Sequence, residues 1–392
     1  MSKTVQILTL IGTAFHNNYG QCLQAYALQY ILEKFGCTVE IINFVPSDII
    51  GLPKNRLKKA FRLIKELKIG QLIDGIFNLA FGTSDISKKK ENSFESFVRS
   101  HLKLSKNIFY NIDQLSCNLK PAEYIIVGSD QVWYPWTIDL LKIYLLGFRS
   151  KPKKISYAAS IGTNLSDKYK ELFRDYLTTF DFISVREKTS MDELSLLTNK
   201  KIEIALDPTL LLNCNEWKKI EAEPEFPIKD NYTLVYDLVR SDEILESADK
   251  IARKLGMPLV CYSHLTFRKK IKYRSLMRSI CEYGPREFLW FISNSNYVIT
   301  SSFHGVAFSI LYKKPFIAIN PFGGKYGLPV DKSMRIKDLL RMLELDNRFL
   351  DDPRELKCRA FYESINWQNV EDKLLIEREK SINYLKRSLS LI

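Results

Sequence analysis

Short apolar runs recur along the chain, and many of them end in a polar or glycine-containing cluster. Such runs are typical of strands that are buried in a parallel sheet. The runs that we predict as strands are Val5–Ile11, Val39–Phe44, Tyr124–Val127, Lys154–Ala158, Phe182–Val185, Ile202–Leu206, Tyr232–Tyr236, Pro258–Tyr262, Tyr297–Thr300 and Pro315–Ile319. Apolar residues at helical spacing predict helices over Gln21–Phe35, Asp242–Leu255, Lys332–Leu343 and Asn369–Ser390, and over the run that follows Gly305.

The alternation of strands and helices predicts an α/β protein with two Rossmann-like domains. A chain of 392 residues exceeds one ordinary hydrophobic core. The stretch 213–231 is charged, carries Pro224 and Pro227 and has few aliphatic residues, which is typical of a domain boundary. We therefore expect an N-terminal domain over 1–215, with a basic helical insertion near 52–105. A C-terminal domain is expected over 230–392, including the last helix.

The segment Tyr297–Ile319 places a histidine at a position where α/β folds commonly carry catalytic or ligand-binding residues. It predicts a strand, then the cluster Ser301-Ser302-Phe303-His304-Gly305, then a helix and a second strand. Ligands of parallel sheets bind at the carboxyl ends of strands, against helix N-termini. Local sequence alone leaves two interpretations open: a catalytic His304, or a serine helix cap beside a surface histidine.

Four successive predicted strands of the first domain also end in polar residues. The clusters are Gly128-Ser129-Asp130, Ala159-Ser160, Arg186-Glu187 and Asp207-Pro208-Thr209. The loop after the first strand adds His16 and Asn18, before a predicted helix. Each cluster alone is compatible with a turn or a helix cap. Four in series are what the rim of an active site requires. Neither a dinucleotide fingerprint nor a P-loop sequence is present.

The composition limits the class of protein, its expected compartment and its expected partners. The 46% apolar residues indicate a packed globular protein, and no run is long enough to span a membrane or to form a signal peptide. The seven cysteines have no metal-ligand spacing, so we expect reduced thiols in a cytoplasmic protein and no metal site. The net charge of +13 comes from dispersed residues without a nucleic-acid motif, so no nucleic-acid partner is expected.

A local excess of lysine and arginine lies between Lys54 and Lys90. There Leu57, Phe61 and Ile64 share one predicted helical face, and cations occupy the other. A basic amphipathic helix can bind an anionic membrane surface, which predicts a possible peripheral contact with the inner membrane face. The same pattern suits a helical hairpin packed on the domain, and we favour packing.

Several motifs, taken together and in order, resemble the polysaccharide pyruvyl transferase family along nearly the whole chain. They are Asn18-Tyr19-Gly20-x-x-Leu23-Gln24-Ala25-Tyr26-Ala27-Leu28, Gly128-Ser129-Asp130-Gln131-Val132-Trp133, Tyr157-Ala158-Ala159-Ser160-Ile161-Gly162, Ser184-Val185-Arg186-Glu187, Leu206-Asp207-Pro208-Thr209, Gly284-Pro285-x-x-Phe288 and Ser302-Phe303-His304-Gly305. The resemblance implies a GT-B-like architecture, in which two Rossmann-like domains face each other across a cleft.

The activity that the resemblance implies is transfer of the pyruvyl group of phosphoenolpyruvate to a hydroxyl pair of a saccharide. The product is a cyclic ketal made during capsule or exopolysaccharide biosynthesis. Phosphoenolpyruvate is the donor substrate, the acceptor is a lipid-linked or nucleotide-linked saccharide, and no cofactor is implied.

The chemistry of this reaction can be matched to residues. Proton transfers to the enol carbon and from a hydroxyl require a general acid and a general base, for which His304 and Asp130 are the candidates. The donor's phosphate and carboxylate require cations and N–H groups, expected from Arg186, Lys325 and the helix start at Gly305. Further substrate contacts are expected from His16, Asn18, Ser129, Ser160 and Ser302.

One position departs from the family's pattern. Members commonly carry an arginine two residues before the motif histidine, where it is thought to contact the donor phosphate, whereas this chain has Ser302. Two alternatives therefore stay open beside the pyruvyl transferase. One is a GT-B-type glycosyltransferase that uses a nucleotide sugar, and the other is a catalytically silent glycan-binding protein. A last histidine, His101, is expected to be structural.

Overall fold

A computed structural model describes residues 2–12, 17–46, 83–148, 151–228, 231–238, 242–262, 272–273, 275–320, 333–352 and 363–392. Most of the basic segment 54–90 therefore lies outside the described residues, as do His16 and Lys325. Among the described residues, no helix is both long enough and apolar enough to cross a membrane.

The N-terminal domain is built on a parallel sheet. Within the described residues its seven strands have the order β3-β2-β1-β4-β5-β6-β7. The elements are β1 (Thr4–Leu8), α1 (Tyr19–Lys34), β2 (Thr38–Phe44), α5 (Thr83–His101), β3 (Leu104–Phe109), α6 (Ile112–Asn118), β4 (Tyr124–Val127), α7 (Ile138–Tyr144), β5 (Lys153–Ala159), α8 (Asp167–Leu177), β6 (Phe182–Val185), α9 (Lys188–Ser195), β7 (Ile202–Ile204), the 3-10 helix η1 (Pro208–Leu211) and α10 (Cys214–Lys218).

The C-terminal domain contains a second parallel sheet. In the part of the chain that the structure describes, its strand order is β10-β9-β8-β11-β12-β13. The elements are β8 (Thr233–Tyr236), α11 (Asp242–Leu255), β9 (Leu259–Cys261), β10 (Leu276–Ser279), α13 (Pro285–Asn294), β11 (Tyr297–Thr300), α14 (Phe303–Leu311), β12 (Phe316–Ile319), α15 (Met334–Met342), the 3-10 helix η2 (Asp346–Arg348), β13 (Phe349–Leu350) and α16 (Trp367–Ser388).

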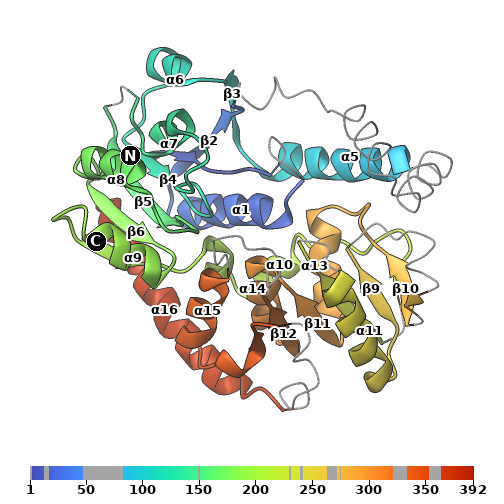
Figure 1. Cartoon of the computed structure of the whole chain (residues 1–392). Helices are drawn as coiled ribbons and strands as arrows, with labels where there is room; N and C mark the ends of the chain where they lie inside the picture. The colour runs from blue at the N-terminus through green and yellow to red at the C-terminus, as the bar shows by residue number, and fades with distance from the viewer. Residues whose placement is uncertain are drawn as a thin grey trace, which may run out of the picture.

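Both sheets reverse their strand order at one point, and this positions the site. The reversal lies between β1 and β4 in the first sheet and between β8 and β11 in the second. At such a switch point, the connections that follow two neighbouring strands run to opposite sides of the sheet. This leaves a crevice at the carboxyl ends of the strands, where ligands bind. Figure 1 shows the two domains one above the other, with α1 lying along their boundary. The interaction between the domains therefore involves the helix that follows the first strand.

The two domains share a hydrophobic core. One continuous set of buried side chains includes residues of α1, η1 and α10 together with residues of α13 and α14. Trp217 of α10 is fully buried in this core, between the rings of Tyr26 in α1 and Phe308 in α14. Its indole N–H donates to the carbonyl of Thr209 at 3.1 Å. This packing connects the end of the first sheet to the second domain.

The last helix, α16, returns from the second domain to the first, and the C-terminus lies near α9 and β6 (Figure 1). The hydroxyl of Tyr384 donates to the carbonyl of Ser156 in β5 at 2.8 Å, and the Ser381 hydroxyl accepts from the backbone N–H of Leu206 at 2.9 Å. The ring of Tyr384 is buried. The end of α16 therefore covers the first sheet as well as joining the two domains.

The predicted strands in the centre of both sheets are confirmed within one to three residues at each end. Three strands at or near sheet edges were not predicted: β3, β10 and β13. Their side chains are half-buried or exposed at many positions, so they lack the continuous apolar pattern of central strands. Helix α5 ends at His101, and Leu104 begins β3.

We expect Tyr384→Ala to lower the free energy of unfolding by about 3 to 5 kcal/mol, as for other buried aromatic side chains truncated to alanine. The matched control is Leu375→Ala on the same helix, whose side chain is exposed, and its effect should stay within about 0.5 kcal/mol. Denaturant unfolding followed by circular dichroism measures both. Equal losses in the two variants would show that α16 is not anchored through Tyr384.

Candidate active site

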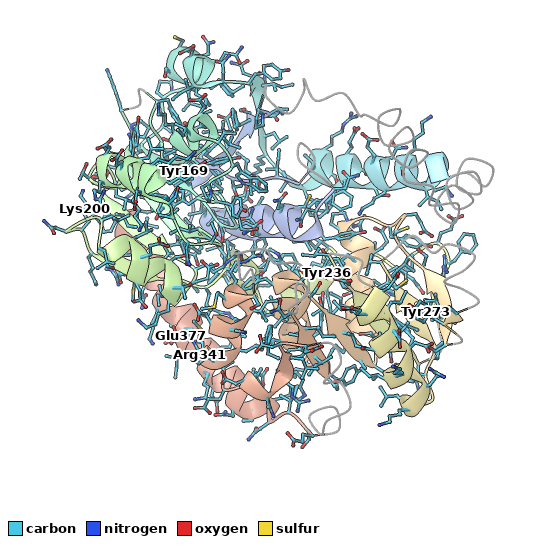
Figure 2. The ribbon with its side chains drawn as sticks, in the orientation of Figure 1. Tyr169, Lys200, Tyr236, Tyr273, Arg341 and Glu377 are labelled. Atoms are coloured by element: carbon cyan, nitrogen blue, oxygen red, sulfur yellow. The ribbon has the colours of Figure 1, made fainter. Side chains whose placement is uncertain are left out.

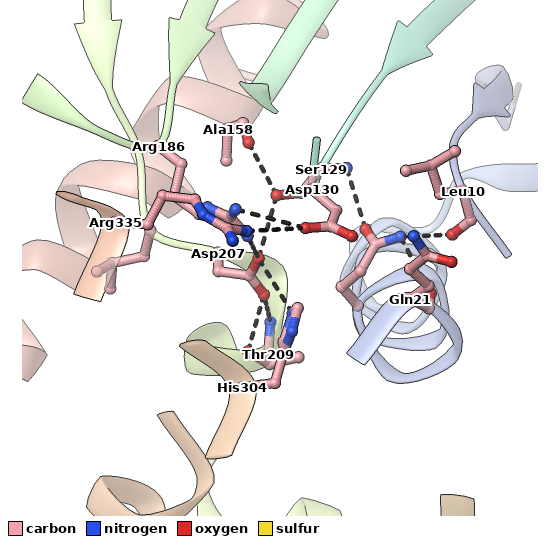
Figure 3. A network of polar contacts seen from close by, with 12 residues as sticks. Leu10, Gln21, Ser129, Asp130, Ala158, Arg186, Asp207, Thr209, His304 and Arg335 are labelled. Carbon is pink, nitrogen blue, oxygen red and sulfur yellow. Dashed lines mark hydrogen bonds and ion pairs between the residues drawn. The ribbon is translucent and has the colours of Figure 1, made fainter. Parts of the chain in front are cut away.

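Polar side chains from both domains meet at the domain boundary, and those of the first domain follow the carboxyl ends of strands. Asp130 follows β4, Arg186 follows β6, and Asp207 precedes η1. His304, in the first turn of α14, and Arg335, in the first turn of α15, come from the C-terminal domain. Figure 3 shows these five side chains close together. We call them the interdomain polar cluster.

Arg186 forms the centre of the interdomain polar cluster. Its Nη1 lies 2.7 Å from Oδ2 of Asp207, its Nε 2.9 Å from Oε1 of Glu187, and its Nη2 3.4 Å from Oδ1 of Asp130. The guanidinium also lies 4.3 Å from the centre of the Phe303 ring. Burial lowers the pKa of Arg186, but the neighbouring carboxylates, Glu187 foremost, raise it above its ordinary value. Arg186 therefore stays charged and holds three carboxylates in fixed positions.

Asp207 connects the arginine to the histidine. Its Oδ2 lies 3.6 Å from Nε2 of His304, while its Oδ1 accepts hydrogen bonds from the backbone N–H and the hydroxyl of Thr209 at 3.0 and 2.8 Å. Burial raises the pKa of Asp207, but His304, Arg186 and the Thr209 N–H together hold it well below its usual range. The ionised carboxylate thus orients the imidazole from the other domain.

The opposite side of the His304 ring is limited by a glycine. A Cβ atom on Gly20, in the first turn of α1, would lie 2.0 Å from Nδ1 of His304. No side chain fits there, so the ring is held between α1 and Asp207. Nε2 of His304 is buried and has no hydrogen-bond partner among the described residues. Nε2 faces Oδ2 of Asp207 at 3.6 Å, longer than an ordinary hydrogen bond, so Asp207 acts on the imidazole mainly through its charge.

Asp130 lies on the other side of Arg186. Its backbone has φ of 66°, a left-handed conformation that aspartate tolerates better than most residues. Its carbonyl accepts hydrogen bonds from Val132 and Ser160 at 2.8 and 3.0 Å, which fix the turn after β4. The carboxylate faces Arg186 and, at 3.8 Å, Nη1 of Arg335. Asp130 and His304 are therefore joined through Arg186 and Asp207 rather than by direct contact.

Several predicted site residues have structural partners. The Ser129 hydroxyl donates to the carbonyl of Ala158 at 2.8 Å and lies 3.2 Å from Oδ2 of Asp207. Asn18 and Ser302 cap α1 and α14 through hydrogen bonds from the third residue after each. A Cβ on Gly305 would lie 2.2 Å from Oγ1 of Thr300, so this glycine permits close packing of helix on strand. Direct substrate contacts by these residues stay predictions.

The structure brings Arg186 and Ser160 to the predicted site but changes how their roles are understood. Arg186 is balanced by carboxylates of the protein, so the role that its geometry supports is positioning, and contact with a donor stays a prediction. The Ser160 hydroxyl is fully buried and has no hydrogen-bond partner in the described part of the chain. His101 stacks on Phe97, with ring centres 4.7 Å apart, in the last turn of α5.

Three contributors were not predicted. Asp207 carries the same signal as Asp130, a carboxylate directly after a strand, and could have been selected on that ground. Gly20 lies within a motif but has no local pattern that indicates contact with His304. Arg335 follows a segment outside the described residues, and its sequence indicates only a helix start.

A pocket of about 640 Å³ lies at the domain boundary and is lined by residues of both domains. The hydroxyl of Tyr236 is hydrogen-bonded to the side chain of Ser302, two residues before His304, and burial raises its pKa. Figure 2 shows Tyr236 where the two domains meet. The pocket is lined by Asn17, Asn18, Tyr19, Ile86, Ser87, Lys90, Tyr236, Asp237, Leu238, Tyr262 and Cys281.

We expect Asp207→Asn to lower the free energy of unfolding near neutral pH by about 3 to 5 kcal/mol, because it leaves the buried Arg186 without its closest partner. The folded-state pKa of Asp207 lies below that of an unperturbed aspartate, about 3.9, so the ionised carboxylate stabilises the fold fully above that pH. The contribution is lost as the pH falls through the lower, folded-state pKa. The difference between wild type and variant should therefore shrink below about pH 4.

Denaturant unfolding at a series of pH values between about 3 and 7 tests this dependence. Asp192→Asn is the control, because Asp192 forms an exposed pair with Lys188 and should contribute less than about 1 kcal/mol. A destabilisation by Asp207→Asn that is as large at the lowest pH as at neutral pH would contradict the assigned role of its charge.

Comparison with known proteins gives the family and the fold. A family model described as polysaccharide pyruvyl transferase matches residues 18–321, most of the chain. No curated protein gave a significant match. Among solved structures, Arabidopsis thaliana UGT89C1 complexed with UDP-L-rhamnose is similar over 99% of both chains, with 9% identity and a TM-score of 0.50. S. aureus MnaA with UDP covers 100% of this chain and 98% of its own, with 13% identity and a TM-score of 0.49.

At such identities the first of these structures shows the fold alone, a GT-B architecture of two α/β domains. This agrees with the two facing parallel sheets and confirms the fold class predicted from the sequence. The family model covers both domains, including the strand ends that supply Asp130, Arg186, Asp207 and His304. The chain therefore belongs to the polysaccharide pyruvyl transferase family.

Proposed function

We propose that this transferase moves the pyruvyl group of phosphoenolpyruvate onto two hydroxyls of a saccharide, in capsule or exopolysaccharide biosynthesis. The observation that supports it best is the pair formed across the domain boundary by His304 and Asp207, at 3.6 Å. An imidazole can give and take protons near neutral pH, and a buried carboxylate fixes its orientation. Membership of the family supplies the reaction class, and the pair supplies a group able to carry its proton transfers.

The proposed reaction balances without a cofactor. A proton adds to the methylene carbon of phosphoenolpyruvate, which becomes a methyl group, and the adjacent carbon gains oxocarbenium character. One saccharide hydroxyl adds to that carbon, the bond to the phosphate oxygen breaks, and the second hydroxyl closes the ketal. Of the two hydroxyl protons, one corresponds to the proton gained by carbon and the other leaves on inorganic phosphate. We assign these transfers to His304 and Asp130 as the general acid and base.

The acceptor is proposed to enter from the pocket at the domain boundary. Tyrosine rings can pack on the apolar face of a sugar, while amide and carboxylate groups bond its hydroxyls. The pocket offers Tyr236 and Tyr262 for the first purpose and Asn17, Asn18 and Asp237 for the second. A lipid-linked or nucleotide-linked saccharide would present its sugar in the same way. Cytoplasmic action and peripheral membrane contact through 56–90 stay predictions.

Two other functions have an observation in their favour. The overall similarity to a structure that holds UDP-L-rhamnose favours a nucleotide-sugar transferase. The serine at position 302, which caps α14 and provides no charge, favours a silent glycan-binding protein. A single assay separates the three: release of phosphate from phosphoenolpyruvate and of nucleoside diphosphate from sugar nucleotides, across a panel of acceptor glycans. Only acceptor-dependent phosphate release supports the proposal, whereas nucleotide release or glycan binding without turnover of either donor would replace it.

His304→Ala should lower turnover by about a hundredfold to ten-thousandfold, the usual contribution of a proton-transfer residue. His101→Ala is the matched control, because His101 stacks on Phe97 in α5 and takes no part in the interdomain polar cluster. Steady-state phosphate release measures both variants. Near-normal turnover in His304→Ala would exclude the catalytic assignment.

Gly20→Ala should also reduce turnover, by about a hundredfold, because the added methyl group displaces the His304 ring and misplaced catalytic groups cost rates of this order. Gly256→Ala is the control: its new Cβ meets no neighbouring atom within 4 Å, although its φ of 64° will cost some stability. Thermal unfolding and turnover are measured together. If Gly20→Ala retains full turnover, contact with α1 does not position the ring.

A further inference from the structure

Arg335 has donor groups that the protein leaves unused. It begins α15, and its side chain is 14% exposed. Nη1 lies 3.8 Å from Oδ1 of Asp130, which is longer than a hydrogen bond, and Nε is buried with no hydrogen-bond partner among the described residues. Figure 3 shows its guanidinium beside that of Arg186. A buried cation with unfilled donors is costly unless a ligand completes it.

The electrostatic surroundings of Arg335 also favour the binding of an anion. Burial lowers the pKa of Arg335, and repulsion from Arg186 lowers it further, while Asp130 acts in the opposite direction. Arg186 has three carboxylate partners at 3.4 Å or less, whereas Arg335 has one at 3.8 Å. An added anion would therefore gain more from Arg335 than from Arg186.

Two further unused donors lie around Asp130. The Ser160 hydroxyl is fully buried, and the Ser160 backbone N–H donates to the Asp130 carbonyl at 3.0 Å. Nε2 of Gln131, the residue after Asp130, is also buried without a hydrogen-bond partner in the described residues. It lies against Gly162, where a Cβ would come within 2.1 Å of it. Unpaired buried polar atoms are rare in folded proteins, and these two belong to residues that flank the backbone turn carrying Asp130, so they are candidate ligand contacts.

The position where members of the family commonly carry an arginine provides no charge in this chain. Ser302 accepts a hydrogen bond from the backbone N–H of Gly305 at 3.4 Å and is bonded to the Tyr236 hydroxyl, so it acts as a helix cap. Among the described residues, an anion bound between the domains therefore has its charge partner at another position. Arg335 lies on the facing domain, at the N-terminus of a nine-residue helix, where the helix dipole also favours negative charge.

We propose that Arg335, with Ser160 and Gln131, forms an anion subsite that binds the phosphate group of a small-molecule substrate. The planar guanidinium suits bidentate contact with phosphate oxygens. A phosphate bound there attracts Arg335 away from Asp130. Asp130 then still has Arg186 as a cationic neighbour. The identification of that substrate as phosphoenolpyruvate rests on the proposed function, but binding of phosphate at Arg335 does not.

Isothermal titration of the full-length protein, without acceptor, tests the subsite with three probes: phosphoenolpyruvate, inorganic phosphate and pyruvate. Arg335→Ala should weaken binding of phosphoenolpyruvate and phosphate at least about tenfold and leave pyruvate nearly unchanged. Arg335→Lys keeps the charge without the planar fork and should recover part of the affinity. The control is Arg341→Ala, because Arg341 is on the same helix, exposed, and paired with Asp338.

Unchanged affinity for both phosphate-bearing probes in Arg335→Ala overturns the proposal, as does a wild-type protein that binds none of the three. A loss confined to pyruvate shows a carboxylate subsite and overturns the phosphate assignment. If Arg335→Ala does not fold, judged by circular dichroism, Ser160→Ala replaces it and must weaken phosphate binding for the subsite to stand.

The two proposals fail in different ways. Arginine-dependent phosphate binding without acceptor-dependent turnover removes the proposed function and keeps the subsite. Turnover of phosphoenolpyruvate with a KM that Arg335→Ala does not change removes the subsite and keeps the function.

Discussion

The burial of one carboxylate, that of Asp207, constrains the rest of the structure. A charge without solvent is costly unless it is paired, and the partners of Asp207 come from both domains: Arg186 and Thr209 from the first and His304 from the second. The domains must therefore meet in one arrangement for the charge to be balanced. The requirement that stabilises the domain interface also assembles the groups available for proton transfer.

The fold makes this arrangement possible through a repeated feature. Each parallel sheet has a switch point, and polar side chains from both domains meet at the domain boundary. Polar groups at strand ends can then be buried among partners from the facing domain, while the helices around them share one apolar core. The C-terminal helix strengthens the same interface, because it begins on the second domain and ends against β5 and β7 of the first.

The charge distribution within the interdomain polar cluster is uneven. Arg186 is surrounded by carboxylates and acts as a fixed positive centre, whereas Arg335 approaches the same centre with only a distant partner. Two guanidinium groups close together favour an anion between the domains. His304 pairs with Asp207, which also binds Arg186.

The α/β class, the central strands and the polar strand ends could all be predicted from the amino-acid sequence. These are local properties: a strand buried on both faces must be apolar throughout, and its end is marked where polar residues begin. Edge strands such as β10 were missed, because partial exposure removes that pattern.

Which strand ends meet was decided by the tertiary structure alone. Asp130 and Asp207 carry the same signal in the sequence, but only the packing of the domains places Asp207 at His304 and Asp130 at Arg335. Gly20 contacts His304 across 284 positions of chain, so no local pattern could have revealed it. The physical reason is that burial and charge pairing across an interface depend on contacts between distant segments, whereas propensity and periodicity record only neighbours.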